Sequence, residues 1–121
     1  MSYQWISDYC LQKPGAQEEF QTEWQANKLM IDNKMFAFYG QDNVGNDILT
    51  LKLSPEHGIA YRELYPDQVI PGYYMNKVHW NTIMLESDIS QDFIKECLDE
   101  AYQLILASLS KKRQTEILGE K

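Results

Sequence analysis

The sequence has only two cysteines among its 121 residues, Cys10 and Cys97, and they are far apart. It contains no CxxC pair and no spacing of a zinc finger, so it gives no support for a redox pair or a structural zinc site. Each cysteine lies in an apolar pattern with helical spacing. This pattern predicts two small buried thiols rather than a disulfide.

Long apolar runs are also missing, since none approaches the roughly 18 residues that cross a bilayer. The N-terminal residues Met1–Trp5 lack the basic start and apolar stretch of a signal peptide. We therefore expect a cytoplasmic protein with no membrane partner. A chain of 121 residues is long enough for a real core but short for two, so we expect a single domain over residues 1–121.

Basic residues are scarce: 11 Lys and Arg stand against 18 Asp and Glu, which gives a net charge of −7. Proteins that bind phosphate groups of nucleic acid usually carry a surplus of cations. This chain would have to concentrate its few cations on one face to bind DNA or RNA. Solubility alone explains the acidity equally well.

Local signatures of catalysis are absent, because the sequence contains no GxSxG elbow, no Walker loop and no GxGxxG. Its two histidines, His57 and His79, do not stand at a two-ligand helical spacing with another histidine or cysteine. The pair Glu56–His57 is interpreted as part of a helix start. We therefore expect a non-enzymatic protein without a metal ion or cofactor.

Apolar residues at steps of three and four predict helices. The first carries Trp5, Ile6, Tyr9 and Cys10, begins after Ser2 as its cap and ends at Pro14–Gly15. A short helix over Pro55–Leu64 follows the cap Ser54. Ser90 caps the longest helix, whose apolar stripe is Ile94, Leu98, Ala101 and Ile105. The tail from Lys111 is predicted to form a short helix or to fray.

Alternating patterns and short apolar runs predict strands. They cover Glu19–Gln25, Lys28–Ile31, Met35–Tyr39, Ile48–Leu53 and Trp80–Leu85. In Ile48–Leu53 the three leucines are predicted to face the core, while Thr50 and Lys52 face away and Thr50 is exposed. The tripeptide Asp32–Lys34 predicts a tight hairpin, and Gly40–Asp47 predicts a long exposed loop.

This order of elements predicts an α+β fold. It consists of an antiparallel sheet of about five to six strands, with the N- and C-terminal helices packed on one face.

A window without acidic residues, Val69–Leu85, contains the candidate binding site. A cation, an imidazole and an indole near a turn can hold a phosphate, a carboxylate or an unstacked base. The alternative is that Trp80 packs and His79 bonds a carbonyl group. The candidate ligand or nucleic-acid-binding residues are Lys52, Tyr74, Asn76, Lys77, His79 and Trp80.

Three segments carry a resemblance to a known family: Tyr9–Ala16, Leu51–Glu56 and Met75–Thr82. In this order and spacing the chain resembles the MmcQ/YjbR family of small bacterial proteins, with Asn76-Lys77-Val78-His79-Trp80 as the most specific part. The resemblance implies a frataxin/CyaY-like α+β fold. It also implies DNA binding by a double-wing arrangement of hairpins, which is how family members are commonly labelled.

The proposed wings are poor in cations. Gly40–Asp47 contains two aspartates and no Lys or Arg, and the first hairpin offers Lys28 and Lys34 against Asp32. Three functions therefore remain open: nucleic-acid binding, a small-anion or metabolite site at Lys52, Lys77 and His79, and a protein-interaction surface using Tyr73 and Tyr74. The expected oligomeric state is a monomer or weak dimer.

Overall fold

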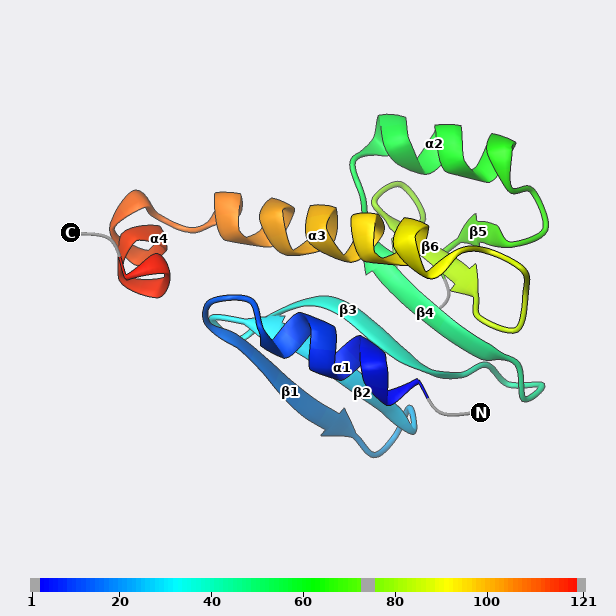
Figure 1. The fold of residues 1–121 in the computed structure, drawn as a ribbon, viewed down its shortest axis with the longest axis horizontal. Coiled ribbons are helices and arrows are strands. Elements are labelled where there is room, and N and C mark those ends of the chain that lie inside the picture. The colour runs from blue at the N-terminus through cyan, green and yellow to red at the C-terminus, as the bar shows by residue number, and fades with distance from the viewer. Residues whose placement is uncertain (1–2, 73–75, 120–121) are drawn as a thin grey trace.

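A computed structural model describes residues 3–72 and 76–119. Within these ranges the chain forms one six-stranded antiparallel sheet, in the order β1-β2-β3-β4-β6-β5, and four helices (Figure 1). The elements are α1 (Gln4–Leu11), β1 (Ala16–Gln21), β2 (Ala26–Ile31), β3 (Lys34–Gln41), β4 (Asp47–Lys52), α2 (Pro55–Leu64), β5 (Val69–Pro71), β6 (Trp80–Met84), α3 (Gln91–Ser108) and α4 (Lys111–Leu118). The predicted α+β fold is confirmed.

Short turns join the first four strands. The β2–β3 turn is the tight hairpin predicted from the sequence, with Asp32 and Asn33 at φ values of 53° and 65°. Asp and Asn tolerate this left-handed conformation better than most residues, and it matches the twist of two-residue hairpins. After α2, β5 and β6 complete the sheet, because β6 pairs with β4 on one side and with β5 on the other.

The helices α1 and α3 lie side by side on one face of the sheet, as predicted (Figure 1). Leu49, Leu51 and Leu53 are fully buried beneath them, together with Leu98 of α3. The hydroxyl of Tyr9 in α1 donates a hydrogen bond of 2.7 Å to Asp99 of α3.

The helix α2 packs beside α3 on the same face. The rings of Tyr61 and Phe93 meet edge to face, with their centroids 4.9 Å apart. Helix α2 also contacts β5. Its N-terminus is fixed by Glu100, whose carboxylate accepts hydrogen bonds from the backbone N of Ser54 at 2.8 Å and pairs with His57 Nδ1 at 2.5 Å. His57 therefore links α2 to α3 in addition to belonging to the helix start.

Both cysteines are buried free thiols, as predicted. Burial raises the pKa of Cys10 to about 12 and also raises that of Cys97. Thiols with such pKa values remain protonated at neutral pH and react slowly.

The predicted strand Glu19–Gln25 is wrong in its bounds. Strand β1 begins earlier and ends at Gln21, and residues 22–25 form a turn. This turn is closed by a hydrogen bond from Gln25 N to Thr22 O, and Gln25 has a φ of 51° that no strand residue adopts. Trp24 therefore leaves the sheet and packs its ring 5.2 Å from that of Phe38. Ser2, the predicted cap of α1, lies outside the described residues, and Tyr3 occupies the N-cap position.

Thr50 faces away from the helices but is fully buried, so its predicted exposure is wrong. It lies in a central strand, between Phe38 of β3 and Thr82 of β6. Its hydroxyl is 2.8 Å from the hydroxyl of Thr82, which satisfies both groups out of water. Lys52, at the end of the same strand, is half-buried.

The tail forms the ordered helix α4, which lies at one end of the molecule (Figure 1). Ser110 caps it by accepting a hydrogen bond of 3.1 Å from Arg113 N. Ile117 of α4 packs over Gly15 in the turn before β1, so closely that a Cβ at Gly15 would lie 2.8 Å from Ile117 Cγ2.

We expect Gly15→Ala to destabilise the protein more than Gly45→Ala. Both glycines have positive φ, 74° and 88°, which costs alanine about 1–2 kcal/mol. Only Gly15 faces a neighbour, since no atom lies within 4 Å of a Cβ at Gly45. Urea denaturation of both variants measures the difference. Equal losses would contradict the packing of α4 on this turn.

Candidate nucleic-acid interface

The turn before β6 is built by the side chain of Asn76. Its Oδ1 accepts hydrogen bonds from the backbone N of Val78 at 2.8 Å and of His79 at 3.3 Å. Its carbonyl oxygen accepts a further bond of 2.9 Å from Trp80 N. Asn76, predicted as a ligand-binding residue, therefore closes this turn and positions the residues that follow.

Trp80 is buried, with 9% of its surface exposed. Its carbonyl oxygen accepts a hydrogen bond of 2.8 Å from Gly72 N, and a Cβ at Gly72 would lie 2.7 Å from Trp80 Cβ. Of the two interpretations of this indole, its burial favours packing over base stacking. The predicted site residue Tyr74 and its neighbour Tyr73 lie outside the described residues.

Four basic or imidazole residues belong to the segments that meet at this turn: Lys52, Arg62, Lys77 and His79, hereafter the window patch. Arg62 Nη1 donates a hydrogen bond of 3.3 Å to the carbonyl oxygen of Lys77, whose own Nζ donates to Gly72 O at 3.0 Å. Lys52 stands opposite Trp80 in the β4–β6 register. His79 is exposed, and its carbonyl oxygen accepts a bond of 2.8 Å from Leu53 N.

Arg62 is the member of the window patch that was not predicted from the sequence. It belongs to α2 and lies 15 residues before Lys77 in the chain. The only signal for it in the sequence is its place in the last turn of a predicted helix, a common position for any basic residue.

The β3–β4 turn presents negative charge. Asp42 Oδ1 accepts hydrogen bonds from the backbone N of Val44 and of Asn46, at 3.0 and 2.9 Å. Slight desolvation raises the pKa of Asp42, but these bonds to its carboxylate outweigh it and lower the pKa below its ordinary value. The carboxylate at this turn is therefore ionised at neutral pH, which disfavours contact with phosphate.

The β2–β3 turn has a different charge balance because α4 lies against it. Arg113 of α4 holds Asp32 at the tip of the hairpin, with 2.9 Å between Nε and Oδ1. Arg113 Nη1 also lies 3.6 Å from Oε1 of Glu116, so this one cation faces the aspartate of the turn and a glutamate of its own helix. Three exposed lysines are neighbours of this ion pair in the sequence: Lys34 follows the turn, and Lys111 and Lys112 precede Arg113. We call these three lysines the hairpin patch.

The described residues contain no group of three or more His, Cys, Asp or Glu side chains that could hold a metal ion. Within the same ranges, none of the helices is both long enough and apolar enough to cross a membrane.

Comparison with known proteins identifies the family. The sequence profile described as YjbR matches residues 11–104. The chain belongs to the YjbR family. It is 28% identical over 109 residues to the uncharacterised protein YjbR of Escherichia coli (strain K12), which covers 90% of this chain and 91% of that relative. It is 36% identical over 76 residues to the uncharacterised protein YyaQ of Bacillus subtilis (strain 168), covering 62% and 63% of the two chains.

Solved structures with the YjbR-family fold agree with the architecture described above. The crystal structure of Deinococcus radiodurans protein DR2400, described with the domain DUF419, has a TM-score of 0.82 at 25% identity and covers 96% of this chain and 86% of that one. A crystal structure of a Pseudomonas syringae protein has a TM-score of 0.71 at 21% identity, covering 86% and 98%, and supports the fold alone. The resemblance found in the sequence is thus confirmed for family and fold.

Proposed function

We propose that this YjbR-family protein is a non-catalytic module that binds DNA or RNA through phosphate contacts. The contacts come from the hairpin patch and from the window patch. The double-wing arrangement implied by the family resemblance supports the proposal, with the β2–β3 hairpin as the wing that carries cations.

The observation that carries this proposal is the ion pair between Arg113 and Asp32. Arg113 is shared between Asp32 and Glu116, at 2.9 and 3.6 Å, and it brings α4 against the hairpin tip. Lys34, Lys111 and Lys112 are exposed on the two segments that this contact joins. Without α4, the same tip would present one lysine and one unpaired aspartate.

The cations in the first turn of α4 also support phosphate binding. Lys111, Lys112 and Arg113 occupy the start of the helix, and no acidic residue lies in this turn. The positive end of a helix dipole favours anions and disfavours cations, so this arrangement costs the free protein stability. A bound phosphate would relieve that repulsion while accepting hydrogen bonds at the helix N-terminus.

We expect a short fluorescent DNA to bind with modest affinity that falls steeply as salt rises, because each neutralised phosphate releases counterions. About two to four contacts should set the slope of log K against log salt. The double change Lys111→Ala and Lys112→Ala should lower the slope by about two, and Lys77→Ala by about one. Fluorescence anisotropy at several salt concentrations measures these slopes.

Lys95→Ala is the matched control for Lys77→Ala, because it removes the same charge from α3, where Lys95 lies over the ring of Tyr9. Its slope should equal that of the unchanged protein. Adding inorganic phosphate tests the small-anion alternative, in which millimolar phosphate would displace the DNA at constant ionic strength. The absence of DNA binding by the folded protein at low salt would contradict the proposal.

A further inference from the structure

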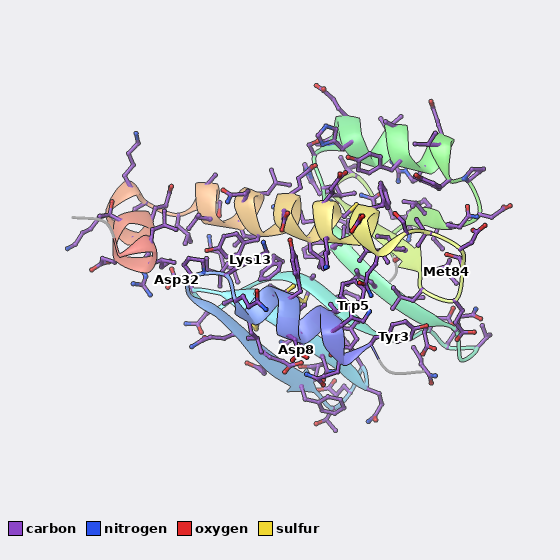
Figure 2. The ribbon with its side chains drawn as sticks, viewed as in Figure 1. Tyr3, Trp5, Asp8, Lys13, Asp32 and Met84 are labelled. Atoms are coloured by element: carbon purple, nitrogen blue, oxygen red, sulfur yellow. The ribbon has the colours of Figure 1, made fainter. Side chains whose placement is uncertain are left out.

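A groove surrounds Tyr3 at the start of α1. Three adjoining hollows, of about 520, 300 and 140 Å³, all have Tyr3 in their walls. The largest lies between Tyr3 and the segment Leu85–Ser87, with Asp47 at its side. Figure 2 shows Tyr3 and Trp5 at the start of α1, on the side toward β4.

Among the residues that the structure describes, the walls of the groove carry negative charge and no cation. Asp47 and Glu86 line the largest hollow, and no Lys, Arg or His is found among the described residues that line any of the three. Glu86 Oε1 accepts a hydrogen bond of 3.3 Å from the backbone N of Asp47, and Asp47 Oδ1 accepts one of 3.2 Å from Gln41 Nε2. Both residues therefore bring a carboxylate to the wall of the same hollow.

The groove also has apolar walls. Leu85 is shared by the largest and the smallest hollows, and the smallest is further lined by Trp5, Ile89 and Ile94. Burial raises the pKa of Tyr3, and the charges of Asp47 and Glu86 raise it further. The phenol therefore stays neutral and lies within the field of both carboxylates.

We propose that this groove binds an organic ammonium ion that carries an apolar group. The ammonium lies between Asp47 and Glu86, where its three N–H groups reach carboxylate oxygens. The ring of Tyr3 adds cation–π attraction. The apolar group extends past Leu85 toward Trp5, into the part of the groove that lacks charge.

The wall chemistry favours an ammonium over a metal ion. Calcium takes six to eight oxygen ligands, and magnesium demands an octahedral set. The groove offers two carboxylates, and the described residues contain no cluster of three metal-binding side chains. An ammonium needs fewer ligands and gains from the aromatic and aliphatic walls. This proposal is independent of nucleic-acid binding, because it uses none of the residues of the two cationic patches.

The test is a titration of the ¹⁵N-labelled protein with 2-phenylethylammonium chloride, followed by two-dimensional NMR. The amide signals of Gln41, Asp47, Leu85 and Glu86 should shift together and give one dissociation constant. The neutral analogue 2-phenylethanol should bind at least about tenfold more weakly, because it lacks the charge-assisted hydrogen bonds. Glu86→Gln keeps the shape and the acceptor oxygen and should weaken the ammonium about tenfold.

Asp88→Asn is the matched control, because it removes the same charge from an exposed residue two positions from Glu86. It should leave the dissociation constant unchanged. The proposal is overturned if the alcohol binds as well as the ammonium, if Asp88→Asn weakens binding as much as Glu86→Gln, or if no shifts occur at millimolar ligand. It is also overturned if magnesium chloride shifts the same amides at a lower concentration, since the groove would then be a metal site.

Discussion

Leu51→Ala and Leu98→Ala should each lower the free energy of unfolding by about 2–5 kcal/mol. Both side chains are fully buried, Leu51 in the central strand β4 and Leu98 on the face of α3 that covers it. Alanine removes apolar contacts from both layers and leaves a cavity that rigid neighbours fill only in part. Urea denaturation midpoints, with unchanged m-values, measure the loss.

Thr50 and Thr22 provide the comparison for these leucines. Thr50→Ala should cost about 1–3 kcal/mol, because it removes the buried hydrogen bond between the two threonine hydroxyls. Thr22→Ala, at an exposed residue of the β1–β2 turn, should stay within about 0.5 kcal/mol. Equal small effects at Leu51 and Thr22 would show that β4 does not form the centre of the sheet.

Trp80→Ala should have an equally large effect on stability, about 3–5 kcal/mol. Its indole is buried where β6 begins, and its backbone holds Gly72 in place. If packing is its role, the change should lower the unfolding free energy while DNA affinity, measured under conditions in which the variant is fully folded, stays near that of the unchanged protein. Urea denaturation and fluorescence anisotropy on the same samples separate the two effects.

Trp80→Phe serves as the control, because it keeps an aromatic ring that fills most of the same volume. It should recover much of the lost stability. The opposite outcome would show that the indole contacts nucleic acid. In that case Trp80→Ala would leave the unfolding free energy nearly unchanged and weaken single-stranded DNA by the roughly 1–3 kcal/mol of one stacked base.

The parts of the fold that depend on regular spacing could be predicted from the sequence. The alternating leucines indicated which face of β4 meets the core. The apolar stripe of α3 indicated that this helix covers that face. One feature broke the spacing, and a second could not be obtained from spacing at all. Phe36 is an extra residue in β3 at a bulge, so that Phe36 and Ala37 are adjacent and both fully buried. Thr50 lies on the predicted face, but periodicity cannot show whether that face meets water.

Only those parts of the candidate site that are close together in the sequence could be predicted from it. The acid-free window drew attention to Lys77 and His79 because they are close together in the chain. Arg113 reaches Asp32 across 81 residues, and no local pattern reports such a contact. Asn76 was predicted as a binding residue, and in the structure its side chain closes the turn; an Asn suited to binding a ligand is equally suited to closing a turn.

The two edges of the sheet affect how the protein behaves at high concentration. An exposed edge strand offers free backbone groups on which another chain can add a strand and start aggregation. Strand β5 is only three residues long and ends in Pro71, which has no N–H to donate. At the opposite edge, β1 carries Glu18 and Glu19 in succession, so two copies meeting edge to edge would bring like charges together. The acidity that opposes DNA binding therefore also protects this sheet from pairing with copies of itself.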